Sequence, residues 1–331
     1  MDNEIKKRKV LLITPDYMDY TAVICSGISE YLDAETHLIT TSGKELRFTY
    51  RNSFHRIQNF FSKLFLNKNQ KKIFYSNAIK EKLETVFKEH SYFDDIFILR
   101  PDLIKEHLAF IKDHGRRLIA YFWDSFSRIP EGKRTIQFFD KFFSFEPKDV
   151  KDHHLLFLPN FYSPDLAINK NEQPHFDLSY VASHDNRLKI LEEILVSLRP
   201  LDLKTNINIL STKAIASKNE NEKSITWFTD VLPRKETIRI MNDSNVLLDI
   251  SQPKQEGLSF RFFEAMKLEK KMITTNKAII TYDFYDPNNI YVWKNEDNIP
   301  SRDFFIKPFT PIPPFIAKNY SLENWIKKVF E

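Results

Sequence analysis

The feature that most constrains the fold is a series of short apolar runs that alternate with segments of helical periodicity. The runs of the first half are Lys9–Thr14, Glu35–Thr41, Asp95–Leu99, Arg117–Trp123, Lys141–Phe145 and Leu155–Leu158. Such runs are too short for ordinary helices and are typical of strands buried on both faces of a sheet. Strands that alternate with helices predict a parallel sheet with helices on both sides.

The helical segments of this half are Tyr20–Leu32 and the stretches 54–68 and 71–90. Asp102 is expected to cap the start of a further helix, and Gly115 is expected to end it, because Asp is common at helix starts and Gly at helix ends. The first half is therefore predicted to be a doubly wound α/β domain covering residues 1–160.

The same alternation restarts after a linker, Pro159–Pro174, that contains three prolines. The strands of the second half are predicted at Asp177–Ala182, Asn206–Leu210, Ser224–Phe228, Asn245–Ile250 and Lys271–Thr275, and its helices at Arg187–Leu198, Lys235–Asn242 and after Gly257. This predicts a second domain over 175–307, as expected for a chain of 331 residues.

A tail, 308–331, follows the second domain and is expected to pack back toward the first. Four prolines between Pro308 and Pro314 exclude a helix or a central strand there, and Ser321 is expected to cap a closing helix that runs through Phe330. Two doubly wound domains are expected to bind ligands in a cleft at the carboxyl ends of their strands.

Charge and composition exclude several classes of function. The net charge of +4 is dispersed over 49 basic and 45 acidic residues, so nucleic acid is not an expected partner. The single cysteine, Cys25, excludes an intramolecular disulfide and a cysteine-based metal site, and it fits a reducing cytoplasm. No signal peptide and no apolar run of about 20 residues is present, so no transmembrane helix is expected.

The segment Glu256–Glu264 carries the strongest indication of function. Two carboxylates, separated by seven residues, flank Gly257, one of only five glycines in the chain. The segment follows a buried strand, and Ser259 is a plausible cap for the next helix. Unpaired N–H groups and the positive dipole end at a helix start suit a diphosphate, to which Arg261 would add a charge-assisted contact. A solvated acidic pair beside an ordinary turn remains the alternative.

Two further segments lie at the ends of predicted strands. Ser183–Arg187 follows the first strand of the second domain, where doubly wound folds place a phosphate loop, but it lacks the glycines of a dinucleotide fingerprint. Ser183, Arg187 and Lys189 remain candidates for the diphosphate, against the alternative of a solvated helix start. Asp124, after a strand of the first domain, is a candidate base for an acceptor hydroxyl or simply an N-cap.

The motif at 256–264, followed by Ala-Met, resembles the Glu-x7-Glu motif of the GT-B glycosyltransferases, particularly of bacterial enzymes that assemble capsule or lipopolysaccharide. Upstream, Phe228–Asp249 resembles the donor-base loop of that family with the helix and strand that follow it. The resemblance is specific from about 176 to 290, whereas the first half is similar only in its alternation of strands and helices. It implies a GT-B fold of two Rossmann-like domains that face a cleft.

The resemblance also implies roles for individual residues. Glu256 would face the donor sugar and Glu264 the ribose hydroxyls. The phosphates would lie against the helix start at Gly257, Leu258 and Ser259, and the base would lie against the loop Thr229–Pro233, whose neighbourhood supplies the candidates Val231, Leu232 and Arg234. The sequence departs from the family pattern after Glu256, where Gly-Leu-Ser replaces the commoner Gly-Phe-Gly-Leu.

The donor implied is a UDP- or GDP-linked sugar that is a substrate, and no cofactor is expected. No metal site is predicted either: adjacent His153 and His154 point apart, and no Asp-x-Asp occurs. The motif favours retention at the anomeric carbon, in which the leaving phosphate assists; inversion would require a base such as Asp124. Asp16 and Tyr17, after the first strand, are further acceptor-site candidates.

Helix 54–68 combines an apolar stripe with basic residues and suggests two alternatives. The stripe consists of Phe54, Ile57, Phe60, Phe61, Leu64 and Phe65, and the basic residues include Arg51, Arg56, Lys63, Lys68, Lys71 and Lys72. A basic amphipathic helix binds anionic membranes peripherally. The alternative, that the stripe packs against the sheet, is favoured because helices of α/β domains look much the same.

Three functions are consistent with these residues. The first is a cytoplasmic glycosyltransferase, peripheral at the inner face of the membrane if the basic helix binds there, with a glycan or lipid-linked envelope acceptor. The second is a nucleotide-sugar 2-epimerase on the same fold. The third, a non-catalytic envelope-assembly or nucleic-acid-binding module, is the least supported because the charge is dispersed.

Overall fold

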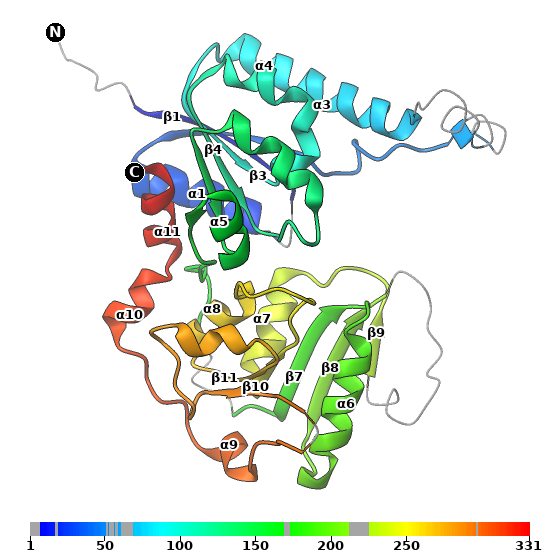
Figure 1. Ribbon diagram of the computed structural model, residues 1–331, viewed down its shortest axis with the longest axis vertical. Coiled ribbons are helices and arrows are strands. Elements are labelled where there is room, and N and C mark those ends of the chain that lie inside the picture. The colour runs from blue at the N-terminus through cyan, green and yellow to red at the C-terminus, as the bar shows by residue number, and fades with distance from the viewer. Residues whose placement is uncertain are drawn as a thin grey trace. The chain divides into compact units, whose positions relative to one another are not determined.

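The protein forms two compact units, each with its own sheet (Figure 1). The computed structural model describes residues 7–16, 19–50, 52, 56, 59–60, 69–168, 173–211, 225–295 and 297–331. The N-terminal unit comprises Met1–Ser144, Asp149–Phe157 and Val329–Glu331, and the C-terminal unit comprises Phe145–Lys148 and Leu158–Lys328. The short segment Phe145–Lys148 thus belongs to the second unit although it lies between strands of the first.

The N-terminal unit contains a six-stranded parallel sheet in the order β2-β1-β3-β4-β5-β6. Its strands are β1 (Lys9–Thr14), β2 (Glu35–Thr40), β3 (Phe93–Leu99), β4 (Gly115–Phe122), β5 (Lys141–Ser144) and β6 (Leu156–Phe157). The connecting helices are α1 (Tyr20–Leu32), α3 (Gln70–Glu89), η1 (Pro101–His107), α4 (Leu108–Lys112), η2 (Pro130–Phe138) and α5 (Pro147–His153), of which η1 and η2 are 3₁₀ helices. The first two residues of α5 belong to the C-terminal unit.

Alternation of side chains along each strand gives this sheet two apolar faces. Leu11 and Ile13 of β1 pack in one cluster with Ile79 and Leu83 of α3. The β1–α1–β2 and β2–α3–β3 connections run in opposite directions across the sheet, so right-handed crossovers place α1 and α3 on opposite faces. The sheet is therefore doubly wound, as the sequence predicts.

One predicted helix of this unit is wrong in its bounds. Asp102 is not a cap: it lies inside η1, which begins at Pro101 after Arg100 in the left-handed region at φ 59°. Pro101 suits the first helical position, since its fixed φ and missing N–H cost nothing there. Gly115 does not close the helix either, because it is the first residue of β4.

The C-terminal unit contains a second six-stranded parallel sheet in the order β12-β11-β10-β7-β8-β9. Its strands are β7 (Phe176–Ser183), β8 (Thr205–Leu210), β9 (Ile225–Phe228), β10 (Ser244–Asp249), β11 (Lys271–Thr274) and β12 (Ile290–Val292). Its helices are α6 (Leu188–Leu198), α7 (Arg234–Asn242), α8 (Phe260–Lys267), α9 (Arg302–Ile306), α10 (Pro314–Asn319), α11 (Leu322–Phe330) and the 3₁₀ helices η3 (Arg199–Leu201) and η5 (Lys277–Thr281).

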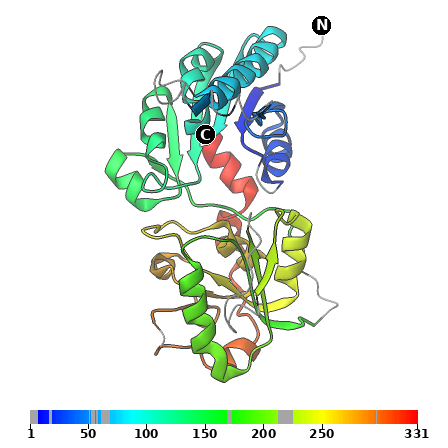
Figure 2. The same cartoon turned by 90° about the vertical axis from the view of Figure 1, so that its right-hand side faces the viewer.

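Strand β10 supplies the centre of this unit with side chains on both faces. Val246 and Leu248 lie in an apolar cluster with α6 and α9, whereas Leu247 lies in a separate cluster with α7 and α8. Figure 2 shows α6 and α7 on different sides of the sheet. Because both faces are covered, β10 reads as an almost continuous apolar run in the sequence.

The structure tests the predicted cap of the closing helix, but it does not test the predicted membrane contact of segment 54–68. As predicted, Ser321 caps the closing helix α11: its Oγ accepts a hydrogen bond from the Asn324 N–H at 3.2 Å. Most of segment 54–68 lies outside the described residues, so its membrane contact stays a prediction. Among the helices that the structure describes, none is long and apolar enough to cross a bilayer.

A buried carboxylate holds together three parts of the N-terminal unit that are distant in sequence. Asp95 of β3 is fully buried and accepts hydrogen bonds from Arg8 Nε and Arg117 Nε, both at 2.6 Å. The same two guanidinium groups donate to the carbonyl of Phe330, at 3.2 and 2.8 Å. Asp95 therefore orients both cations that bind the last residues of the chain.

We expect Asp95→Ala to lower the free energy of unfolding of the N-terminal unit by about 3 kcal/mol, because it leaves two partly buried guanidinium groups without their anion. Urea denaturation monitored by circular dichroism measures this loss. Glu84→Ala is the matched control, since Glu84 pairs with Lys80 on the surface of α3 with 55% of its side chain exposed. Equal stability of the two variants would show that the buried ion pairs are not needed.

Candidate functional site

The candidate site is built on the loop that joins β10 to α8. Strand β10 ends at Asp249 and α8 begins at Phe260, so the intervening loop lies at the carboxyl edge of the parallel sheet. Ser183, the last residue of β7, lies at the same edge, because β7 pairs with β10 in parallel. The structure thus places the predicted loops 183–187 and 256–259 at neighbouring strand ends of one unit.

Glu146 organises the start of the motif. Its carboxylate is 1% exposed and accepts hydrogen bonds from the Glu256 N–H at 3.1 Å and the Gly257 N–H at 3.2 Å. Gly257 is required by close packing: a Cβ there would lie 2.4 Å from the carbonyl oxygen of Phe145. Two backbone donors of the loop are therefore bound by a protein carboxylate.

Three amide side chains bind the carbonyl groups of the same loop. Asn160 Nδ2 donates to the Leu258 carbonyl at 2.9 Å, and Gln255 Nε2 donates to that of Gly257 at 2.9 Å. Asn276 Nδ2 donates to the carbonyls of Glu256 and Gly257 at 3.2 and 3.3 Å. Satisfied donors and acceptors on both sides of the chain hold the loop in one conformation.

Ser259 takes the predicted N-cap position of α8, but its side chain makes a different bond from the one expected of a cap. It accepts no hydrogen bond from the helix and instead donates to Asp249 Oδ1 at 2.7 Å. Thr274 donates to Asp249 Oδ2 at 3.2 Å. Burial raises the pKa of Asp249, against the lowering effect of the hydrogen bond from Ser259. The Ser259 hydroxyl is therefore bonded to Asp249 at the end of β10 and not to the first N–H groups of α8.

The second acid of the motif, Glu264, belongs to an ionic cluster in which Glu264 and Arg234 are buried and Asp165 is exposed. Glu264 is 6% exposed, and its carboxylate accepts a hydrogen bond from Arg234 Nη1 at 3.3 Å, while Arg261 Nη1 lies 3.9 Å away. Arg234 also donates from Nε and Nη2 to the two oxygens of Asp165, each at 3.1 Å. Burial acts to raise the pKa of Asp165, but the bonds from Arg234 outweigh it and the pKa lies below its ordinary value.

The first acid, Glu256, differs from Glu264 in the exposure and in the pairing of its carboxylate. Its side chain is exposed, whereas its backbone is bound by Glu146 and Asn276. Within the described part of the chain, its carboxylate makes no hydrogen bond or ion pair. Glu256 thus offers a solvent-accessible anion on a fixed backbone, and Glu264 offers a buried anion that is already paired.

Arg187 joins the loop after β7 to the end of β10. Its Nε donates to Asp185 at 2.9 Å, and its Nη1 donates to the carbonyl of Ile250 at 2.9 Å. Gln252 Nε2 also donates to Asp185, at 3.0 Å. Burial acts to raise the pKa of Asp185, but the bonds from Arg187 leave that pKa below its ordinary value. Ser183 is exposed beside this network, as is Lys189.

The predicted base loop lies between β9 and α7. Val231 is 64% exposed, which is unusual for a valine, and Leu232 is half-buried. Arg234, the first residue of α7, points its guanidinium at Asp165 and Glu264. The loop therefore presents apolar side chains to solvent next to the cation that pairs with the second acid of the motif.

Asp124 lies in the N-terminal unit, two residues beyond the end of β4. It lies in a bend just before the turn 126–128 and is not a helix cap, because Ile129 caps the next helix. Arg128 Nη1 donates to its Oδ1 at 3.1 Å and Arg100 Nη1 to its Oδ2 at 3.4 Å. Burial raises the pKa of Asp124 above its ordinary value although both cations oppose this.

The other two acceptor-site candidates follow β1. Asp16 donates its backbone N–H to Ser42 Oγ at 2.6 Å, and Tyr17 lies outside the described residues.

Four acids that position the candidate site were missed in the sequence: Glu146, Asp165, Asp185 and Asp249. A local signal existed for three of them. Glu146 and Asp249 each fall at the end of an apolar run, and Asp185 lies within a segment already singled out. No such signal marks Asp165, because it lies in the linker and meets Arg234 only through the fold.

Asp249→Asn should become more stable relative to the natural protein as pH rises from about 4. The folded state binds the Asp249 proton more tightly than the unfolded chain does, so the natural protein loses stability as pH rises from the ordinary carboxyl pKa to the raised pKa of the folded state. Urea denaturation across a pH series measures the difference, with exposed Asp297→Asn as control. A fall in the stability of Asp249→Asn relative to the natural protein as pH rises would contradict this prediction.

Gly257→Ala should lower the free energy of unfolding by about 1–3 kcal/mol, because the new methyl group meets a backbone carbonyl that cannot rotate away. Gly115→Ala is the comparison, since the nearest atoms there belong to the Ile96 side chain, at 2.8 Å. Chemical denaturation of both variants measures the costs. An equal or smaller cost at Gly257 would show that the loop relaxes freely around Phe145.

No protein-family model matches the sequence, and no curated protein matches it either. Solved structures do match in fold over nearly the whole chain. A glycosyltransferase from Rickettsia africae has 12% identity and a TM-score of 0.54, with 98% of this chain and 97% of the other covered. Sucrose-phosphate synthase from Thermosynechococcus elongatus has 8% identity, a TM-score of 0.55 and coverage of 98% and 95%.

A third structure is AviGT4, a glycosyltransferase involved in avilamycin A biosynthesis, with 9% identity, a TM-score of 0.57 and coverage of 97% and 95%. At such identities the likeness concerns the fold alone. Together with the two doubly wound parallel sheets, it confirms the predicted fold class: the chain has the α/β, two-domain GT-B fold.

Proposed function

We propose that this protein is a glycosyltransferase that moves a sugar from a nucleotide-diphosphate donor to a hydroxyl group of a glycan or lipid-linked acceptor. The observation that carries the proposal is Glu256, an exposed carboxylate on a braced loop immediately before the helix α8 of a GT-B fold. Function on a common fold has to be argued from its site.

The proposal assigns the donor to the C-terminal unit. The first N–H groups of α8 and the Arg261 side chain suit a diphosphate, and Val231 with Leu232 offers apolar surface for a base. Glu256 would bind hydroxyls of the donor sugar. Glu264 would bind the ribose, with its carboxylate held in place beforehand by Arg234 and Arg261. UDP- and GDP-linked sugars both fit this assignment.

The proposed chemistry breaks the bond between the anomeric carbon and the donor phosphate and forms a bond to the acceptor oxygen. With retention, which we favour, the leaving phosphate takes the proton of the acceptor hydroxyl. With inversion, a protein base is needed, and Asp124 has the raised pKa that brings a carboxylate closer to the basicity required. No cofactor or metal ion has a part in either scheme.

The acceptor is assigned to the N-terminal unit, where Asp124 lies. We infer a glycan or lipid-linked acceptor of the bacterial envelope, such as lipopolysaccharide or capsule, from the resemblance of the motif at 256–264. A cytoplasmic enzyme at the inner face of the membrane would meet such acceptors, and the basic segment 54–68 would supply peripheral contact with anionic lipid.

Glu256→Gln should reduce sugar transfer at least about 100-fold while leaving nucleotide affinity and stability unchanged. The Glu256 carboxylate is exposed and makes no bond within the described fold. The substitution therefore removes only the negative charge that this side chain would present to the donor. Glu264→Gln should weaken both donor affinity and stability, because its partners are buried cations. Calorimetric titration with UDP and GDP measures nucleotide affinity, and titration with UDP- and GDP-sugars measures donor affinity. Transfer assays and urea denaturation measure activity and stability.

Glu269→Gln, an exposed acid just beyond α8, is the matched control and should behave as the natural protein. Failure to bind any nucleotide sugar would overturn the proposal, and normal transfer by Glu256→Gln would overturn the role of that residue. Rapid turnover of the donor without an acceptor would favour the epimerase. Tight RNA binding with a steep salt dependence would favour the non-catalytic module.

A further inference from the structure

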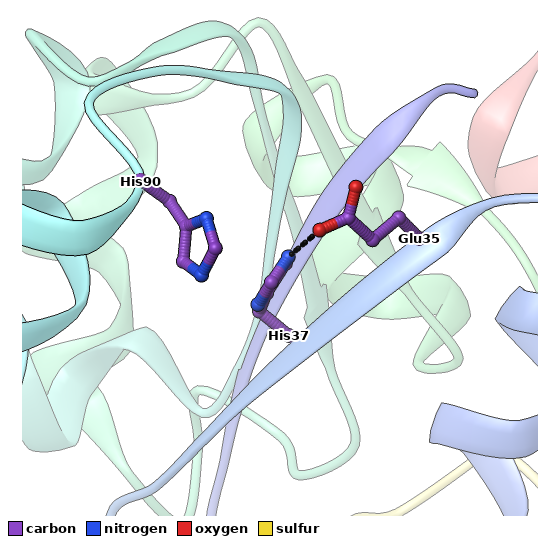
Figure 3. A group of neighbouring side chains, drawn as sticks. All are labelled: Glu35, His37 and His90. Carbon is purple, nitrogen blue, oxygen red and sulfur yellow. Dashed lines mark hydrogen bonds and ion pairs between the residues drawn. The ribbon is translucent and has the colours of Figure 1, made fainter. Parts of the chain in front are cut away.

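Three potential metal ligands meet at one edge of the N-terminal unit, and none of them belongs to the candidate functional site. Glu35 and His37 lie two residues apart on β2, so their side chains share a face of the strand. His90 follows α3 as its C-cap and reaches the same place (Figure 3). One ligand atom from each residue lies within 4.8 Å of both others.

The arrangement is close to that of a bound ion. His37 Nε2 lies 2.9 Å from Glu35 Oε1, and the rings of His37 and His90 are 4.0 Å apart between centroids. Ligand atoms around a tetrahedral zinc ion lie roughly 3.3 Å apart, because each bond is about 2 Å long. The present limit of 4.8 Å exceeds that spacing, so the side chains would have to rotate toward one another to hold an ion.

The surroundings leave the ligand atoms accessible and support the rings. Glu35 is exposed, and the two histidines are half-buried. Lys9 Nζ lies 3.8 Å from the other carboxylate oxygen, Glu35 Oε2, so Oε1 remains on the side of the imidazoles. Fully buried Phe93 contacts the His37 ring edge-on at 5.4 Å between centroids and forms an apolar floor.

We propose that Glu35, His37 and His90 form a binding site for one divalent transition-metal ion of the zinc type. Two imidazole nitrogens and one carboxylate oxygen suit zinc, and a water molecule would complete a tetrahedral set. Magnesium and calcium prefer oxygen ligands alone and do not fit. Since β2 is the edge strand of its sheet, the ion would tie this edge to the end of α3 and the beginning of β3.

The test is calorimetric titration of the full chain with zinc chloride and, separately, with magnesium chloride. One zinc ion per chain should bind, magnesium should not, and zinc should raise the Tm. His37→Ala and His90→Ala should each weaken zinc binding at least about tenfold, since even the loss of an outer partner of a metal ligand costs that much. Glu35→Gln, at an exposed position, should weaken binding without disturbing the fold.

His175→Ala is the matched control, because His175 pairs with Asp243 as an exposed histidine–carboxylate pair that belongs to no cluster of three ligands in the described structure. It should keep full zinc affinity. Absence of saturable zinc binding by the natural protein would overturn the proposal, and this result needs no variant to fold. Undiminished binding by Glu35→Gln and both histidine variants would overturn it equally.

Discussion

The candidate site depends on one buried interaction, the acceptance of two backbone N–H groups by the carboxylate of Glu146. A loop that leaves a parallel strand exposes backbone donors that need partners, and in a helix start these donors attract anions. Here a protein carboxylate satisfies the donors of Glu256 and Gly257. The backbone of Glu256 is held in place, while its side chain is exposed and makes no bond with any residue that the structure describes.

In the rest of the site, the buried charges of Glu264 and Arg234 are paired with each other, and Arg234 is also paired with exposed Asp165. Glu264, Arg234 and Asp165 alternate in sign, and each is bonded to its neighbour. Asp185 and Arg187 form a second such pair beside the end of β10. Isolated charges would be costly in this environment, but paired and hydrogen-bonded charges can fix the relative positions of loops that come from different parts of the chain.

Much of the fold was predictable because both sheets are parallel and covered on two faces. Strands such as β1 and β10 then appear as apolar runs, and α1 was predicted with its observed bounds. The predicted side-chain cap at Ser259 and the predicted cap at Asp102 are wrong because another residue takes the bond or the position that a cap would have. Ser259 was predicted to cap α8 with its side chain, but Asp249, which the fold places beside it, takes the hydroxyl. Asp102 resembled a cap, yet Pro101 starts the helix one residue earlier.

The class of fold follows from the sequence alone, since apolar periodicity is a local property, and the Glu256–Glu264 spacing singles out the segment of the candidate site. Only the tertiary structure distinguished the two acids, leaving Glu256 exposed and burying Glu264 between Arg234 and Arg261. It also brought His90 to Glu35 and His37, and Glu146 to Gly257. Burial and such pairings depend on distances between residues far apart in the chain, which no local pattern encodes.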